Sequence, residues 1–285
     1  MKFNLFILGI SILSLTVGCD KKRDKIFDQQ PTDRLNTSVN NVYTVMQGNK
    51  AGWVMAYYPS SALEFGGYTM FVKFSNNIDV VVEGDFTTQA AQTSTYTVLP
   101  GAGPILTFDT YNSIFHYFAL PQYYTKKTYY RLPGFLNVGV GAINEGMKGE
   151  DDFLVLKATS DSVVLEGRKS YNKMVLTPIK SSEEASIVSS FRAATAKFNA
   201  FGGYKFEVGT EAIPASFKTS ATKRSLLASG NTYAYRYTPT GLSFYTAYEL
   251  MGVKFKELKY IEPTGAYAKG YFSNTDGTLK LVPTT

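Results

Sequence analysis

The sequence predicts a mainly β protein (α+β) in which antiparallel sheets pack against two amphipathic helices. Three observations lead to this fold class. Short runs of β-branched and aromatic residues are separated by glycine, asparagine and proline turns. Two stretches show the apolar spacing of an amphipathic helix. Strands and helices do not alternate along the chain, which argues against a parallel, doubly wound sheet.

The composition supports a folded chain with a large core. The 285 residues are 44% hydrophobic and 15% aromatic, which suits one large or two modest domains and excludes a disordered protein. The single histidine excludes a multi-histidine zinc site, and the single cysteine excludes an intrachain disulfide. We expect no cofactor.

The N-terminus has the pattern of an export signal. Residues 5–17 form an apolar stretch that follows Lys2 and is too short to cross a bilayer as a helix, so residues 1–18 are predicted to be a signal peptide. The junction Gly18-Cys19 resembles the bacterial lipobox, although Thr16 stands where that pattern usually has leucine. The resemblance implies that Cys19 carries lipid and anchors the protein to the outer membrane, on its periplasmic or its surface face. An ordinary secretory signal is the alternative.

A polar tether at residues 19–30 leads into the first β-rich unit, residues 31–180. Leu35, Val39, Val42 and Met46 form the apolar stripe of one helix, which ends at Gly48. A strand is predicted to begin at residue 53. Further strands are predicted at residues 68–74, 78–82, 96–99, 105–111, 153–157, 163–165 and 174–176.

The second β-rich unit is predicted at residues 181–285. Its helix carries the stripe Ile187, Phe191, Ala194 and Phe198, and Ser181 with Glu184 reads as a capping box in front of it. Strands are predicted at residues 204–208, 233–237, 242–248, 253–261, 267–272 and 279–282.

The two halves share an order of landmarks. Each helix is followed by a glycine–aromatic pair, Gly52-Trp53 in one half and Gly203-Tyr204 in the other. Each half then has a Phe-x-Thr triplet, a glycine-ended triplet and a final strand that ends in proline. This order predicts two duplicated helix-plus-sheet units.

A family resemblance rests on three segments and on the lipobox. The segments are Gly66-Gly67-Tyr68, residues 103–112 and residues 153–162, and Ile26-Phe27-Asp28 adds to them. Together they resemble an envelope lipoprotein family of Bacteroidota catalogued as domain of unknown function 4302. The resemblance implies an accessory role in nutrient capture beside TonB-dependent, SusC/SusD-type uptake systems. It assigns no catalytic residue.

Residues able to perform chemistry are few. His116 lies at the end of a predicted strand with no Gly-x-Ser-x-Gly elbow in the chain, so we interpret it as a hydrogen-bonded structural residue. Acids cluster at Glu150, Asp151 and Asp152 and around Gly84, where Glu83 and Asp85 flank the glycine. We interpret them as solvated turn acids. A glycosidase that uses acids such as Asp109, Glu150 or Asp152 and a calcium site are the alternatives.

A ligand site is predicted in the long segment at residues 121–150. Exposed tyrosines there would stack on sugar rings, and neighbouring basic residues would donate hydrogen bonds. An ordinary hairpin is the alternative for this segment. The predicted ligand-binding residues are Tyr123, Tyr124, Lys126, Lys127, Tyr129, Tyr130 and Arg131.

These patterns favour an exported protein that binds a glycan or peptide ligand and performs no catalysis. A glycoside hydrolase and a structural scaffold of the envelope are the other functions that the sequence leaves open. The formal charge of +6 is spread through the chain, and an exported lipoprotein meets little nucleic acid. We therefore expect a membrane partner through the lipid anchor and no nucleic-acid partner.

Overall fold

The structure is a computed structural model that describes residues 28–119, 141 and 146–284. The chain divides into two compact units, Met1–Arg34 and Leu35–Thr285. In the first unit the described residues hold the beginning of helix α2. The second unit contains the rest of α2 and all the strands described below.

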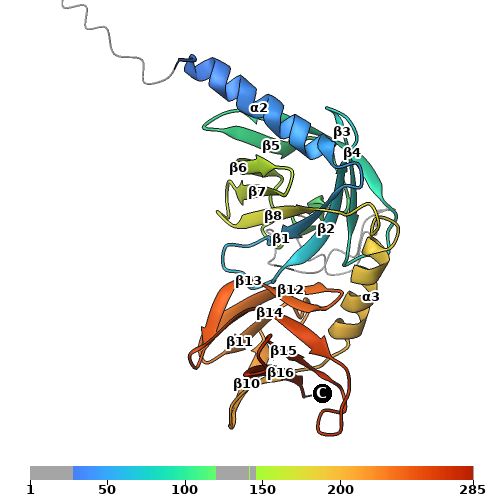
Figure 1. The fold of residues 1–285 in the computed structure, drawn as a ribbon, viewed down its shortest axis with the longest axis vertical. Coiled ribbons are helices and arrows are strands. Elements are labelled where there is room, and N and C mark those ends of the chain that lie inside the picture. The colour runs from blue at the N-terminus through green and yellow to red at the C-terminus, as the bar shows by residue number, and fades with distance from the viewer. Residues whose placement is uncertain (1–27, 120–140, 142–145, 285) are drawn as a thin grey trace, which may run out of the picture. The chain divides into compact units, whose positions relative to one another are not determined.

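The first eight strands form a closed antiparallel barrel, barrel 1 (Figure 1). Each strand pairs with the next, and the barrel closes where Trp53 of β1 pairs with Pro178 of β8. A short 3-10 helix, η1, follows β5. The elements are α2 (Pro31–Gly48), β1 (Trp53–Tyr57), β2 (Tyr68–Phe74), β3 (Asp79–Gly84), β4 (Gln92–Pro100), β5 (Pro104–Phe108), η1 (His116–Phe118), β6 (Asp152–Thr159), β7 (Ser162–Gly167) and β8 (Lys173–Pro178).

The last eight strands form a second closed antiparallel barrel, barrel 2, with the same order. It closes where Tyr204 of β9 pairs with Pro283 of β16. The elements are α3 (Ile187–Asn199), β9 (Tyr204–Val208), β10 (Glu211–Phe217), β11 (Ser225–Ala228), β12 (Asn231–Thr238), β13 (Gly241–Leu250), β14 (Val253–Ile261), β15 (Tyr271–Ser273) and β16 (Leu279–Pro283). The segment between β8 and α3 contains residue 180, where the sequence places its domain boundary.

The predicted fold class is confirmed in its main features, which are β-rich content, antiparallel pairing and two helices. Closure of the strands into barrels was not predicted, and neither were β10 and β11. Two predicted strands are shorter than expected, since β5 ends at Phe108 and β15 begins only at Tyr271. Tyr111 and Tyr267 therefore lie in loops.

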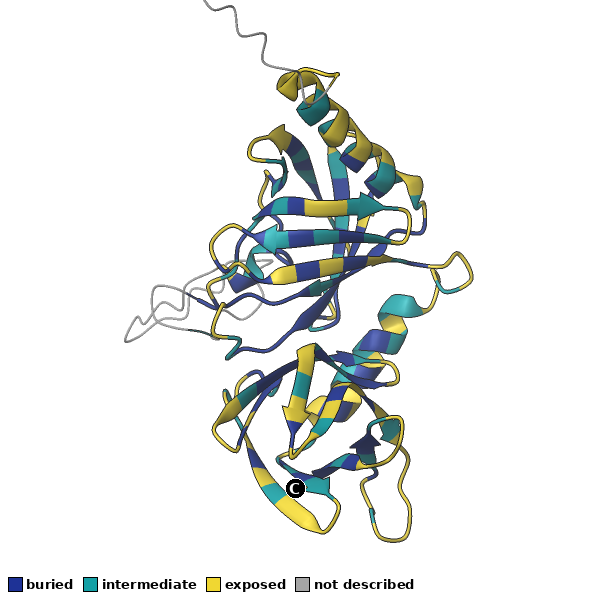
Figure 2. Ribbon diagram, turned by 60° about the vertical axis from the view of Figure 1, so that its left-hand side comes forward, coloured by how far each residue is buried: buried dark blue, intermediate teal, exposed yellow. Residues whose placement is uncertain are grey.

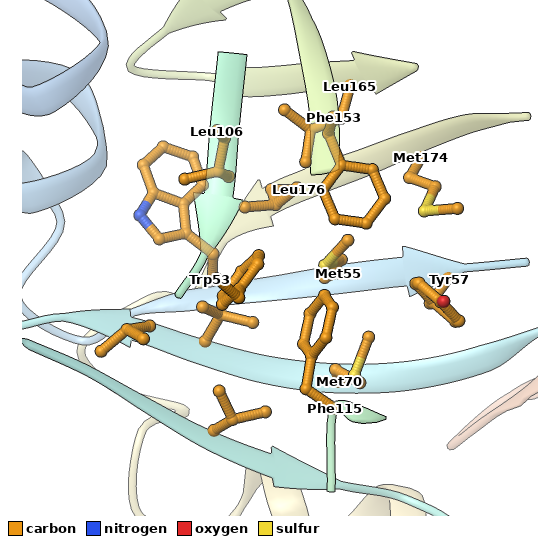
Figure 3. Close-up of a cluster of buried hydrophobic side chains, with 14 of the residues drawn as sticks. Trp53, Met55, Tyr57, Met70, Leu106, Phe115, Phe153, Leu165, Met174 and Leu176 are labelled. Atoms are coloured by element: carbon orange, nitrogen blue, oxygen red, sulfur yellow. The ribbon is translucent and has the colours of Figure 1, made fainter. Parts of the chain in front are cut away.

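Alternating burial builds the core of barrel 1. In β1, Trp53, Met55 and Tyr57 point inward with no exposed surface, because successive side chains of a strand face opposite sides. Figure 2 shows a similar alternation along other strands, of which β3 and β7 are the most regular. In Figure 3, side chains from several strands point toward one another inside the barrel. The labelled ones are Trp53, Met55, Tyr57, Met70, Leu106, Phe115, Phe153, Leu165, Met174 and Leu176.

Barrel 2 has a more aromatic interior. The inward positions of β12 are all tyrosines, and phenylalanines from β9, β13, β14 and β15 pack around them. Tyr233 and Phe255 stack with ring centroids 6.0 Å apart. The buried aromatic residues of these strands are Tyr204, Phe206, Tyr233, Tyr235, Tyr237, Phe244, Phe255 and Phe272.

Helix α2 contributes to barrel 1 through part of its predicted stripe. Val42 and Met46 are buried in the core cluster of barrel 1, and Val39 packs against it. The indole nitrogen of Trp53 donates a hydrogen bond of 2.8 Å to the Met46 carbonyl at the end of the helix. This bond satisfies one of the carbonyls that a helix C-terminus leaves free.

Helix α3 contacts both barrels. Ala194 and Phe198 belong to the core cluster of barrel 2, whereas Phe191 packs edge-on against Phe71 on the outer face of β2. This contact buries Phe71 on the outer face of β2, where Lys73 stays exposed. The predicted capping box is wrong, because the N-cap residue of α3 is Ser186 and residues 181–186 form turns.

A buried ion pair joins the two barrels. Arg224, just before β11, donates to the Asp85 carboxylate at 3.0 Å and to the Gly67 carbonyl at 3.0 Å. Its guanidinium lies 4.4 Å from the ring centroid of Tyr68 and 4.7 Å from that of Tyr237. The Arg224 side chain is 4% exposed and the Asp85 side chain is fully buried. Charges that leave water in this way need such partners.

The backbones of the barrels also meet directly. The Gly67 amide donates to the carbonyl of Tyr235 at 2.9 Å. The neighbouring Gly66 has a φ of +68°, and a Cβ placed on it would lie 1.9 Å from the carbonyl oxygen of Arg224. Only glycine allows this approach. Among the helices of the described residues, none is long and apolar enough to cross a membrane.

Candidate functional site

The residues that the sequence singles out for lipidation and binding lie outside the described residues. This holds for Cys19 and for all seven predicted ligand-binding residues, Tyr123, Tyr124, Lys126, Lys127, Tyr129, Tyr130 and Arg131.

The prediction of solvated turn acids is wrong for Glu150 and Asp85. Glu150 is 3% exposed, and its carboxylate accepts hydrogen bonds from the Lys169 amide at 2.7 Å and from the amide and hydroxyl of Ser170. It thereby holds the turn between β7 and β8. Asp85 forms the ion pair with Arg224 described above. The spacing of these acids around glycines is typical of turns and does not reveal that buried donors face them.

The other acids and His116 also have partners. Asp109 accepts from the Thr97 hydroxyl at 3.1 Å, and an Arg168 nitrogen lies 3.8 Å from an Asp152 carboxylate oxygen. His116 has one ring nitrogen 3.2 Å from the Asn112 amide and the other 3.4 Å from an Asp151 carboxylate oxygen. These contacts agree with the structural interpretation of His116.

A pocket of about 410 Å³ lies on the outer wall of barrel 2. We call it the outer-wall pocket. Its residues come from the end of β9, the start of β14, the loop before β15, and the β15–β16 hairpin. They are Glu207, Val208, Gly209, Val253, Tyr267, Gly277, Thr278 and Lys280. The volume is within the range of small-molecule sites.

Strand register places the two charged residues of the pocket side by side. Phe206 and Leu281 point into the barrel, so Glu207 of β9 and Lys280 of β16 point outward. Glu207 and Lys280 are also direct partners in the β9–β16 ladder. The pocket therefore has an acceptor and a donor on adjacent strands.

A tight loop brings Tyr267 to the same place. Thr264 and Tyr267 exchange two backbone hydrogen bonds, and the Gly270 amide donates to the Tyr267 carbonyl at 2.9 Å. The Tyr267 hydroxyl then donates to Glu207 Oε2 at 2.8 Å and accepts from Lys280 Nζ at 3.1 Å. The Tyr271 ring centroid lies 4.5 Å from that of Tyr267, so two aromatic rings adjoin the charges.

These contacts shift the ionisation of the charged groups. The Lys205 ammonium, 2.7 Å from Glu207 Oε1, holds the pKa of Glu207 below its usual 4.5. The hydrogen bond to Tyr267 raises the pKa of Lys280 above 10.5. The first interaction is lost as the pH falls through the lowered pKa of Glu207, and the second as the pH rises through the raised pKa of Lys280. At neutral pH both groups are charged.

The outer-wall pocket offers the groups that recognise polar, ring-shaped molecules. Tyrosine gives a flat apolar surface with a polar edge, while the ammonium donates hydrogen bonds and the carboxylate accepts them. No three metal-binding side chains gather within the part of the chain that the structure describes.

The residues of this pocket are not among those that the sequence predicts to bind a ligand. Lys280 and Glu207 alternate with buried residues, which predicts that they point outward but not what they face. Tyr267 was assigned to a strand. Glu207 and Lys280 become neighbours only because β9, the first strand of barrel 2, pairs with β16, the last. This closure of the barrel is not visible in the local sequence pattern.

The comparisons with known proteins give one match. A family model described as "Domain of unknown function (DUF4302)" matches residues 23–262. No curated protein and no solved structure matches the chain.

Proposed function

The chain belongs to the family described as a domain of unknown function (DUF4302), and from this premise we propose that it is an envelope protein that binds a saccharide in the outer-wall pocket. The observation that carries the proposal is the arrangement of Tyr267, Glu207 and Lys280 around one pocket. Sugars have apolar ring faces and hydroxyl edges, and this pocket holds a partner for each.

The rigidity of the pocket supports a binding role. Strands β9 and β16 pair over five positions, from Tyr204–Pro283 to Val208–Leu279, so two of the three side chains stand on a fixed ladder. The third is held by its own loop. A binding site whose side chains are placed before the ligand arrives loses less conformational entropy on binding.

The cellular context of the proposal rests on the sequence. The lipobox resemblance at Cys19 supports a lipid anchor in the outer membrane, and the family resemblance supports a partnership with a SusC/SusD-type transporter. In this proposal the protein holds a saccharide near the transporter and does not cleave it.

We further infer that the two barrels arose by duplication. The matching strand order supports this inference. In each half a helix is followed by eight consecutive strands, and the first strand pairs with the last. Structural superposition of barrel 1 on barrel 2 tests this inference, and a good fit only out of strand order would contradict it.

Binding is tested with the full chain, purified in detergent, on an array of plant, host and bacterial glycans. Hits are then titrated by calorimetry against the wild type and Tyr267→Ala. We expect Tyr267→Ala to weaken binding by about 1–3 kcal/mol, or roughly 5- to 150-fold, as for a stacking aromatic with a hydrogen bond.

Tyr171→Ala is the matched control, because Tyr171 is 73% exposed and lies in the β7–β8 turn of barrel 1. It is expected to bind like the wild type. If a glycan binds Tyr267→Ala as tightly as it binds the wild type, the outer-wall pocket is not its binding site.

A further inference from the structure

The polar groups of the outer-wall pocket already have protein partners, which hold them in place. Both carboxylate oxygens of Glu207 are occupied, Oε1 by Lys205 at 2.7 Å and Oε2 by Tyr267 at 2.8 Å. The Thr278 hydroxyl donates to Asp276 at 2.6 Å and accepts from Asn274 at 3.0 Å. Each oxygen of the strongest acceptor in the pocket thus has one protein donor.

Lys280 is the charged donor of the pocket. An ammonium group has three N–H donors. Within the described part of the chain, Lys280 Nζ has one hydrogen-bond acceptor, the hydroxyl of Tyr267 at 3.1 Å. Its charge also lies 4.9 Å from the Tyr267 ring centroid and 5.2 Å from that of Tyr271. The Lys280 side chain is therefore held in place with donor capacity left over.

One nearby carboxylate serves two ammonium groups. Glu207 forms an ion pair of 2.7 Å with Lys205 on the same strand and also attracts Lys280. The carboxylate of Asp276 is engaged within its own turn, where it accepts from the amide and hydroxyl of Thr278. Asp276 does not line the pocket.

We propose that the outer-wall pocket takes an acidic saccharide, whose carboxylate or sulfate group binds Lys280 while a sugar ring lies against Tyr267. This inference rests on the saccharide-binding function proposed above. Sugar hydroxyls both donate and accept, whereas an anionic group only accepts and also carries a negative charge. Lys205 and Lys280 bring two positive charges against the single negative charge of Glu207, so an anion matches the pocket better.

The test uses three ligands that differ only at one carbon. These are oligosaccharides of galactose, of galacturonic acid and of galactose 6-sulfate, titrated into the full chain in detergent at low and high salt. We expect at least one acidic ligand to bind about tenfold more tightly than the neutral one, as for a charge-assisted hydrogen bond, and this preference to shrink with salt. The acidic arm that binds identifies the anionic group.

Two variants assign the preference to one side chain. Lys280→Gln keeps a hydrogen-bond donor but removes the charge, so it should weaken acidic binding more than neutral binding and abolish the roughly tenfold preference. Lys280→Arg should retain the preference. Lys254→Gln, which changes a 79% exposed lysine next to the pocket residue Val253, should behave like the wild type.

The outcomes separate this inference from the function on which it rests. Equal binding of the neutral and acidic ligands, still lost in Tyr267→Ala, overturns the acidic specificity and supports saccharide binding. A preference that survives in Lys280→Gln also overturns the assignment. Absence of binding by any glycan on the array overturns both proposals.

Discussion

The two barrels share a strand order but differ in how they treat buried hydroxyl groups. In barrel 1 the Tyr57 hydroxyl donates to the Glu150 carbonyl and accepts from the Glu150 amide, and the Tyr96 hydroxyl donates to Asn76. In barrel 2 the hydroxyls of Tyr235 and Tyr237 both donate to the carbonyl of Lys223, each at 2.8 Å.

Barrel 2 also buries hydroxyls that have no protein partner among the described residues. The Tyr204 hydroxyl and Ser225 Oγ are both in this state, although Tyr204 is 2% exposed and Ser225 is fully buried. Burial raises the pKa of Tyr204 well above 10, so its phenol stays neutral. The comparison shows that one topology accepts cores of different polarity, and that the more polar core carries unpaired groups at a cost in stability.

The largest expected effect concerns the link between the barrels. Arg224→Ala leaves Asp85 buried without its cation, so we expect a loss of about 3–5 kcal/mol in the free energy of unfolding. Trp53 is the single tryptophan and lies in the core of barrel 1, so its fluorescence follows that barrel, while far-UV circular dichroism follows both. In urea the two signals should coincide for the wild type and separate for the variant.

Arg168→Ala is the control for that experiment. Arg168 and Asp152 form a surface pair at 3.8 Å with side chains 55% and 42% exposed, so its loss should change the stability by about 0–1 kcal/mol. If both arginine variants lose the same stability, the buried pair does not stabilise the contact between the barrels.

A smaller effect is expected inside barrel 1. Glu150→Ala removes the acceptor of the Lys169 and Ser170 amides, and we expect a loss of about 1–3 kcal/mol because these donors stay in the turn without a partner. The Trp53 fluorescence transition in urea measures it. Asp161→Ala, in the exposed β6–β7 turn, should stay within about 0.5 kcal/mol of the wild type. Equal losses would mean that Glu150 behaves as the solvated acid first predicted.

The smallest effects sharpen the contrast between paired and unpaired phenols. Tyr235→Phe removes a hydrogen bond and should destabilise the protein by about 0.5–1.5 kcal/mol, whereas Tyr204→Phe removes an unpaired hydroxyl and should be neutral or stabilising. Thermal unfolding followed by circular dichroism compares them. A loss in Tyr204→Phe as large as that in Tyr235→Phe would show that Tyr204 has a partner, such as a buried water.

Local patterns in the sequence predict most single elements. The ranges of β2, β9 and β14 agree with their predicted bounds, since each is a run of alternating or continuous apolar residues bounded by turns. Strand β10 was missed because it contains Pro214 and exposes most of its residues, and β11 because it has only four residues. Strands of this kind are stabilised by hydrogen bonds to neighbouring strands, and a local sequence pattern does not reveal these partners.

Long-range pairings explain what the sequence did not predict. Arg224 and Asp85 meet across the two barrels, and Lys280 meets Glu207 only once β16 closes onto β9. The predicted binding segment at residues 121–150 stays a prediction. Each residue of the outer-wall pocket fits the pattern of its own strand or loop. The pocket forms only when the strands of barrel 2 pair and bring these residues together.

The way in which the strands follow one another bears on how fast the chain can fold. Nearly every pairing in both barrels is between consecutive strands, and each barrel closes by pairing its first strand with its last, residues 53 and 178 in the first and residues 204 and 283 in the second. Contact order, the mean sequence separation of touching residues, slows folding because loop-closure entropy is lost before the contacts form. The closing step of each barrel therefore spans its longest loop, and that loop is shorter in the barrel that holds the pocket.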